Sequence, residues 1–120
     1  MKEDGLLFYL DDMRLAAGKA RLFLRGINEQ EFNADERTQM ATMMALALIG
    51  EAASRIDTLY PAFVSDHPEI AWSKIRAMKN LIAYDHYRAE LPLSWRTASV
   101  SIPELLDQLD LIRDWHTQGE

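Results

Sequence analysis

The chain has 120 residues, a net charge of −6 and no cysteine, and its pI is near 5.0. Hydrophobic residues make up 48 % and charged residues 27 % of the sequence, which is typical of a globular domain rather than a disordered chain. The acidic balance argues against general nucleic-acid binding by bulk electrostatics. The lack of cysteine excludes disulfides, thiolate zinc sites and a cysteine nucleophile.

The length predicts a single domain over residues 1–120. The first residues carry acids on both sides of a short apolar run, which is not the pattern of a signal peptide. No apolar stretch approaches the roughly 20 residues that a membrane-spanning helix needs. We therefore expect a cytoplasmic protein with no membrane partner, and a cysteine-free chain fits that reducing compartment.

Residues 5–25 are predicted to form the first helix, with Asp4 as its N-cap and Gly26 as its C-terminal stop. Apolar residues recur there at alternating steps of four and three, which places them on one helix face. These residues are Leu6, Leu10, Met13, Ala17, Ala20 and Leu24.

Asn33 and Glu36 have the spacing of a capping box and predict the start of a second helix. It is expected to run for about 25 residues to Leu59, because Pro61 cannot continue it. Its methionines are interpreted as core filling rather than metal ligands. The apolar positions are Met40, Met43, Met44, Ala47, Leu48, Ala52, Ile56 and Leu59.

The second half of the chain gives weaker helix signals. Residues 61–71 are predicted to be a connector with a short turn, and a third helix is expected from Trp72 to about Asp85. Its apolar face would hold Ile75, Met78 and Ile82. Leu91-Pro92 breaks the pattern, and residues 94–100 are expected to begin another helix.

Pro103 is predicted either to start or to kink the last helix, whose apolar positions are Leu105, Leu106, Leu109, Ile112 and Trp115. No segment shows sustained strand alternation. The predicted fold class is therefore all-α, an antiparallel bundle of four or five helices. Such a small bundle with wide apolar stripes is expected to bury the remainder in a dimer.

Gly50 and Glu51 stand in the interior of the long helix. Glycine there costs about 1 kcal/mol relative to alanine, so Gly50 predicts a close helix crossing. We interpret Glu51 as the partner of an arginine that fixes helix packing, with a direct role at a reaction site as the alternative. His67, His86 and His116 include no pair three or four residues apart, so neither a metal site nor a cofactor is predicted. His67 and His116 are expected at the surface.

The stretch AMKNLIAYDHYRAE, residues 77–90, combines an apolar helix with a polar and aromatic cluster. On a straight helix Lys79 and His86 fall within about 20° of each other. A cation that stabilises negative charge and an imidazole that moves protons are the minimum equipment for cleaving a phosphodiester without metal. The commoner alternative is a histidine at a helix end that interacts with the helix dipole. The basic residues around this stretch can likewise be read as solvated helix faces.

Several sequence blocks occur in a distinctive order: FYLDDM at 8–13, DERTQMA at 35–41, IGEAA at 49–53, MKNLIAYDHY at 78–87 and IPELLDQL at 102–109. In these blocks the chain resembles the HepT-like branch of the HEPN superfamily, small helical toxin ribonucleases. The resemblance implies a HEPN-like bundle, a homodimer and metal-independent RNA cleavage at an arginine–histidine motif. It also implies a small nucleotidyltransferase antitoxin, which in some pairs adenylylates the tyrosine two residues after the histidine.

The chain departs from that motif at three positions. Lys79 stands at the arginine position, Tyr84 at the histidine position and His86 at the tyrosine position. Lysine keeps the positive charge but loses the planar fork that grips a phosphate at two points. Tyrosine, with a reference pKa near 10, stays protonated at neutral pH and is a poor general base, although it can still donate a hydrogen bond. His86 would then take over as acid and base.

The resemblance therefore implies a toxin endoribonuclease in which the 2′-hydroxyl of RNA attacks the adjacent phosphate. The implied catalytic residues are Lys79, Tyr84 and His86, the supporting ones are Asn80, Asp85 and Glu51, those that hold the RNA backbone are Arg76 and Arg88, and the candidates for modification are Tyr84 and Tyr87. The first alternative is a catalytically degenerate module that binds a nucleotidyltransferase or a nucleotide. The second is a plain helical dimer with no nucleic-acid role.

Overall fold

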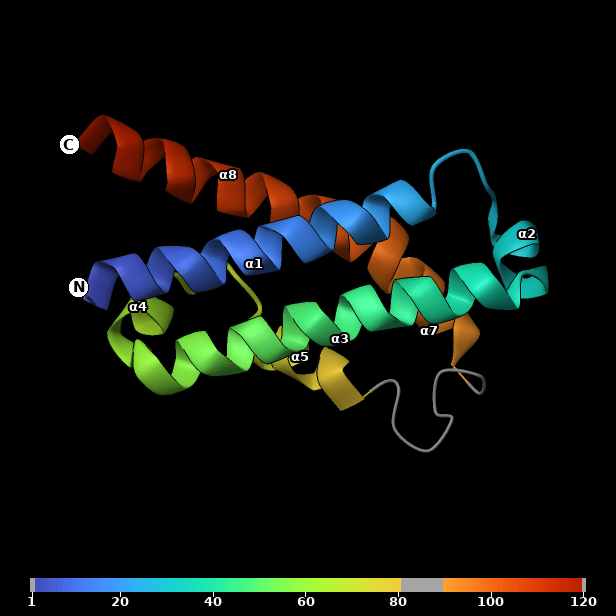
Figure 1. Ribbon diagram of the computed structural model, residues 1–120, viewed down its shortest axis with the longest axis horizontal. Helices are drawn as coiled ribbons and strands as arrows, with labels where there is room; N and C mark the ends of the chain where they lie inside the picture. The colour runs from blue at the N-terminus through green and yellow to red at the C-terminus, as the bar shows by residue number, and fades with distance from the viewer. Residues whose placement is uncertain (1, 81–89, 120) are drawn as a thin grey trace.

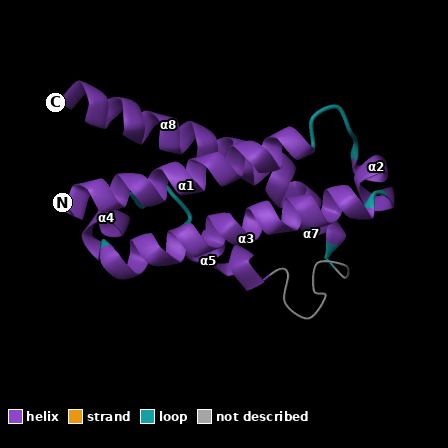
Figure 2. Ribbon diagram, viewed as in Figure 1, coloured by secondary structure: helices purple, strands orange, loops and turns teal. Residues whose placement is uncertain are grey.

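The computed structural model describes the backbone of residues 2–80 and 90–119 and the side chains of residues 5–80 and 90–112, and these ranges contain helices and turns but no strand (Figures 1 and 2). The all-α prediction is therefore confirmed. The elements are α1 (Lys2–Phe23), α2 (Glu29–Ala34), α3 (Glu36–Leu59), α4 (Pro61–Asp66), α5 (Trp72–Ala77), the 3₁₀ turn η1 (Met78–Asn80), α7 (Leu91–Arg96), the π-helical η3 (Thr97–Ser101) and α8 (Ile102–Gly119). Within the described ranges, no helix has the length and apolar character needed to cross a membrane.

Helices α1 and α3 run antiparallel side by side, and α8 lies along the other side of α1 (Figure 1). All six apolar residues predicted to form the stripe of α1 are buried, so that prediction is confirmed. The helix begins at Lys2, so Asp4 lies inside it and is not its N-cap. Gly26 follows the end of α1 with a φ of +78°, a left-handed conformation that favours glycine, and confirms the predicted stop.

The start of α3 differs from the predicted one. Asn33 lies inside α2, and the N-cap of α3 is Asp35, whose carboxylate accepts hydrogen bonds from the hydroxyl and the backbone N–H of Thr38 at 2.7 and 3.2 Å. The capping box belongs to α2 instead, where Asn28 and Glu31 exchange two hydrogen bonds of 2.9 Å each. Two helices, α2 and α3, therefore start where the sequence pattern predicted a single helix start.

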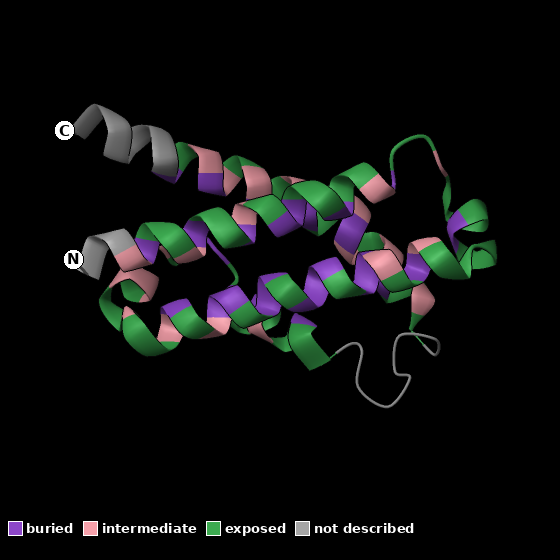
Figure 3. Ribbon diagram, in the orientation of Figure 1, coloured by how far each residue is buried: buried purple, intermediate pink, exposed green. Residues whose placement is uncertain are grey.

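The long helix α3 buries one broad arc and exposes the opposite one (Figure 3). Met43 is fully buried, as predicted, and packs with Leu46, Ile49 and Ile56 in the core. The prediction was wrong for four other apolar positions, Met40, Met44, Leu48 and Leu59, which are 57, 53, 52 and 52 % exposed. The first three are spaced by four residues, so they form a separate exposed stripe on the same helix.

The second half of the fold also differs in detail. Residues 61–66 form the short helix α4 with Pro61 in its first turn, where a missing N–H costs nothing. Pro92 is likewise accommodated in the first turn of α7. The predicted break at Leu91-Pro92 is therefore the start of a helix. Pro103 lies in the first turn of α8, which confirms one of its two predicted roles. In α8, Leu105, Leu109 and Ile112 are buried and Leu106 is half-buried, while the side chains of Trp115 and His116 lie outside the described residues.

Candidate functional site

Residues 72–80, which include the described start of the predicted active segment (residues 77–90), pack directly against α3 at Gly50. A Cβ atom added to Gly50 would lie 2.6 Å from the backbone N of Lys79, 3.0 Å from the O of Ile75 and 3.2 Å from the O of Arg76. All three atoms belong to the backbone, so no side-chain rotation makes room for it. The close crossing predicted from Gly50 is confirmed, and it fixes the distance between α3 and the turn that carries Lys79.

Lys79 extends along α3 from this crossing. Its Nζ donates a hydrogen bond of 3.1 Å to the hydroxyl of Ser54, which lies one helical turn beyond Gly50. Serine is neutral, so this contact positions the ammonium group without cancelling its charge. Ser54 was not identified from the sequence, although its position four residues after Gly50 places it on the same side of α3. Asn80 ends the turn η1 and is exposed.

Arg76, predicted to hold RNA, forms an ion pair with Asp57 of α3, and both side chains are about two-thirds buried. The pair ties α5 to α3 and balances the charge of Arg76. A carboxylate beside the guanidinium also competes with any phosphate for the same donors. Asp57 was missed in the sequence because nothing in the periodicity links it to a residue 19 positions later.

Glu51 pairs with an arginine, as predicted, but the pair does not have the predicted role. Its Oε2 accepts a hydrogen bond of 3.4 Å from Nε of Arg55, one turn along the same helix, and both side chains are more than half exposed. A pair within one helix does not hold two helices together. Both residues instead line a groove of about 420 Å³ between α1 and α3, together with Asp12 and Lys19.

The predicted alignment of Lys79 with His86 depended on a straight α-helix. The α-helix ends at Ala77, and residues 78–80 form a 3₁₀ turn, in which each residue advances about 120° rather than 100°. The predicted α-helix is therefore wrong for Met78–Asn80, whereas residues 81–86, on which the calculated alignment also depends, lie outside the described residues. Tyr84, Asp85, His86, Tyr87 and Arg88 lie outside the described residues, so their roles remain predictions.

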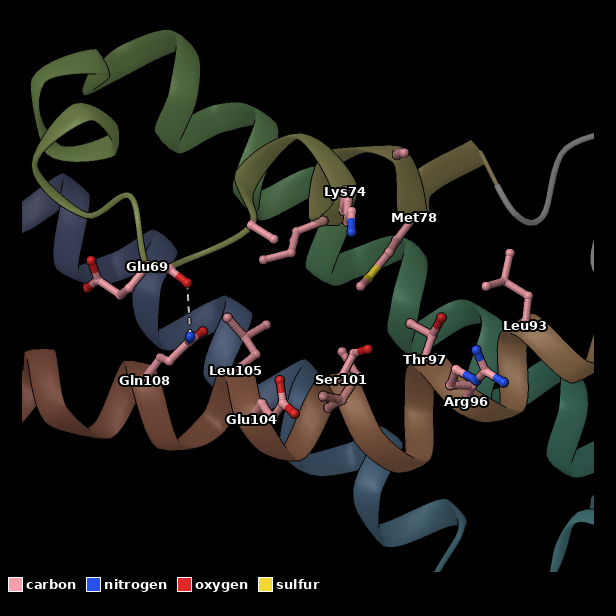
Figure 4. A pocket seen from close by; sticks show the side chains of 14 residues that line it. Glu69, Lys74, Met78, Leu93, Arg96, Thr97, Ser101, Glu104, Leu105 and Gln108 are labelled. Atoms are coloured by element: carbon pink, nitrogen blue, oxygen red, sulfur yellow. Dashed lines mark hydrogen bonds between the residues drawn. The ribbon is translucent and has the colours of Figure 1, made fainter.

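A cavity of about 550 Å³ opens between α5 and η1 on one side and η3 and α8 on the other (Figure 4). Lys74 and Arg96 line it with Glu69 and Glu104, so its charges balance and it has no preference for anions. Gln108 closes one end by donating a hydrogen bond of 3.0 Å to the backbone O of Glu69.

His67 is half-buried rather than fully at the surface. Its ring centre lies 4.4 Å from that of Phe63, and its Nδ1 is 3.0 Å from a carboxylate oxygen of Glu69. This hydrogen bond holds the pKa of Glu69 below its ordinary value. Among the described side chains, no three of histidine, aspartate and glutamate gather as a metal site would require.

The chain is similar in sequence to proteins named as ribonucleases. The family model "Ribonuclease HepT-like" matches residues 13–112. The chain is 30 % identical over 105 residues to "Probable ribonuclease HepT" of Thermococcus cleftensis, covering 88 % of this chain and 93 % of that one. It is 21 % identical over 99 residues to "Putative RNase MJ0127" of Methanocaldococcus jannaschii, covering 82 % and 79 %. No solved structure matches the chain significantly.

Proposed function

Because the chain belongs to the HepT-like ribonuclease family, we propose that it is the toxin of a toxin–antitoxin pair and cleaves RNA without a metal ion. The observation that carries this proposal is the placement of Lys79. It stands at the arginine position of the family motif, its turn is held against α3 at Gly50, and its neutral partner Ser54 leaves its charge available to a phosphate.

In the proposed reaction His86 removes the proton of an RNA 2′-hydroxyl as the 2′-oxygen attacks the adjacent phosphorus. The bond between phosphorus and the 5′-oxygen breaks, and the departing oxygen receives a proton from the imidazolium. Lys79 stabilises the negative charge that builds on the non-bridging oxygens. Tyr84 donates a hydrogen bond to the phosphate, Asp85 orients His86, and Asn80 supports the turn. The products are a 2′,3′-cyclic phosphate and a 5′-hydroxyl.

A second copy of the chain is proposed to cover the face shared by α1 and α3, here called the α1–α3 face. Its large exposed apolar side chains are Phe8, Leu15 and Leu22 on α1 and Met40, Met44 and Leu48 on α3. Leu15 and Leu48 line one groove with Asp12, Lys19, Glu51 and Arg55. Two acids and two bases on one face can pair with the same four residues of a copy related by a two-fold axis, which favours a homodimer.

The proposed antitoxin is a small nucleotidyltransferase, and Tyr84 and Tyr87 are the candidate sites at which it would modify the toxin. This part of the proposal rests on the family relationship, since both tyrosines lie outside the described residues. A toxin that acts on cellular RNA would work in the cytoplasm. Co-purification of the chain with the product of a neighbouring nucleotidyltransferase gene is the expected result.

The proposal is tested by RNA cleavage in the presence of EDTA, comparing the wild type with His86→Ala and Lys79→Ala. Removing a general acid–base should lower the rate by roughly 10²- to 10⁴-fold. His116→Ala serves as a matched histidine control and should cleave normally. If the wild type leaves RNA intact but the triple variant Lys79→Arg, Tyr84→His and His86→Tyr cleaves it, the natural chain is a silent partner-binding module instead.

A further inference from the structure

A second groove is lined by residues from the C-terminal end of α1 and the turn after it, and from α7, η3 and the start of α8. We call it the Arg–Trp groove and define it by Arg21, Arg25, Ile27, Trp95, Ser99 and Pro103. Its volume is about 740 Å³. Arg21 lies in the last turn of α1 and Arg25 follows the end of that helix, and nothing in the proposed reaction uses either of them.

The charge of this groove is opposite to that of the whole chain. Two arginines line it and no acidic residue does, although the chain carries a net charge of −6. The side chains of Arg21 and Arg25 are exposed and form no hydrogen bond or ion pair with any residue that the structure describes. Arg14, Arg55 and Arg76, by contrast, are each paired with a carboxylate. The groove therefore offers guanidinium groups that are free to bind an anion.

An aromatic side chain is held rigidly beside these arginines. Trp95 lines the groove and is half-buried. Its ring is supported from the protein side by Phe32, with ring centres 5.4 Å apart and planes inclined by 47°. Phe32 is completely buried, which fixes this support. A supported indole next to unpaired arginines is the arrangement with which proteins bind a base and its phosphate in single-stranded nucleic acid.

The wall opposite Arg21 and Arg25 includes an unusual turn. η3, residues Thr97–Ser101, is π-helical, and its Ala98 and Ser99 line the groove. A π turn is wider than an α turn and frequently occurs at functional sites. Here it brings the Ser99 hydroxyl, a donor and acceptor, into the same groove as Trp95.

We propose that the Arg–Trp groove binds one or two nucleotides of single-stranded RNA. Arg21 and Arg25 contact phosphates, and a base stacks on Trp95. The proposal rests on the proposed function, because it extends the RNA footprint beyond the site at Lys79. It predicts that longer single strands bind more tightly than a dinucleotide, which occupies the reaction site alone.

The test is binding of a fluorescein-labelled, single-stranded 2′-O-methyl RNA 12-mer, followed by fluorescence anisotropy. This RNA lacks the attacking 2′-hydroxyl and is not cleaved by the proposed reaction. The assay therefore measures RNA binding alone, whether or not the chain is an active ribonuclease. The double variant Arg21→Gln/Arg25→Gln should weaken binding. It should also make the negative slope of log K against log salt shallower by about 1.4, since each contact to a single-stranded phosphate contributes about −0.7. Arg37→Gln, an exposed arginine outside the groove, is the matched control and should keep the wild-type slope.

Trp95→Leu should raise the dissociation constant about five- to 150-fold, and Trp95→Phe should retain part of the affinity, because phenylalanine still stacks. Thermal unfolding of each variant shows whether Phe32 and its surroundings remain packed, and the arginine variants decide the question if Trp95→Leu unfolds. The proposal is overturned if the double variant binds like the wild type, if Arg37→Gln weakens binding equally, or if the wild type does not bind the 12-mer.

Discussion

Replacing Gly50 by alanine tests the closest contact of the candidate site. The new Cβ would meet the backbone N of Lys79 at 2.6 Å and the backbone O of Ile75 at 3.0 Å, so the turn η1 has to move away from α3. Overpacking of this kind costs about 1–3 kcal/mol. Alanine returns up to about 1 kcal/mol through its higher helix propensity. The expected net loss in the free energy of unfolding is up to about 2 kcal/mol.

Gly18→Ala supplies the matched control. Gly18 also lies inside a helix, α1, but a Cβ added to it meets nothing within 4 Å. That variant should gain about 0.5–1 kcal/mol, because alanine stabilises an exposed helix interior relative to glycine. The propensity gain is common to both variants. The difference between them therefore isolates the steric cost at the crossing, about 1–3 kcal/mol.

The assay is urea unfolding of both variants, monitored by circular dichroism at 222 nm, with the slope m checked for constancy. In the Gly50 variant the hydrogen bond from Lys79 to Ser54 should also be disturbed, because η1 carries Lys79. RNA cleavage by this variant should consequently fall more than its stability predicts. If Gly50→Ala is as stabilising as Gly18→Ala, the backbone contact between η1 and α3 does not exist and the description of the site fails.

Three further predictions concern other parts of the fold. Met44→Glu on the α1–α3 face should shift the mass measured by light scattering from that of a dimer to that of a monomer. The control variant Leu111→Glu on α8, where Leu111 is 70 % exposed, should leave the mass unchanged. A dimer that survives Met44→Glu contradicts the proposed interface. Hydrogen bonds from the Thr38 hydroxyl and then from the Thr38 N–H hold the pKa of Asp35 below its ordinary value of 3.8. Their stabilising effect is therefore present above that pH and is lost as the pH falls through the lower folded pKa. Asp35→Asn should unfold in urea with less pH dependence below about pH 4, and an unchanged profile would contradict the assignment. Asp57→Ala should lower the free energy of unfolding by roughly 0.2–1 kcal/mol, because the ion pair with Arg76 is lost. Because this change frees Arg76, it should also steepen the salt dependence of RNA binding. An unchanged salt dependence would show that Arg76 does not reach RNA.

Much of the fold was predictable because its signals are local. The buried stripe of α1 follows from the spacing of Leu6, Leu10 and Met13, and the crossing at Gly50 follows from the cost of glycine in a helix. The start of α3 was not predictable in the same way, because Asn33 and Asp35 are both good capping residues two positions apart. The structure around them depends on contacts that neither capping residue reveals: Phe32 of α2 is completely buried, and its backbone O accepts a hydrogen bond of 2.8 Å from Gln39 of α3.

The candidate site was less accessible to sequence reasoning. The partners of Lys79 and Arg76 are Ser54 and Asp57, 25 and 19 positions earlier, and no periodic pattern records contacts of that range. Helical periodicity also treated residues 72–85 as one regular helix, whereas a 3₁₀ turn follows Ala77. Met44 shows a third reason: an apolar side chain suits the core and a partner surface equally, so its residue type does not reveal which one it faces.

The central claim is that this chain cleaves RNA through attack of the 2′-hydroxyl without a metal ion. The most direct measurement is mass spectrometry of the products after the purified chain has been incubated in EDTA with a single-stranded RNA and with its 2′-O-methyl analogue. We expect cleavage of the RNA alone, with a 2′,3′-cyclic phosphate on one product and a 5′-hydroxyl on the other. Cleavage that requires Mg²⁺, products with a 3′-hydroxyl and a 5′-phosphate, or RNA left intact would contradict the claim.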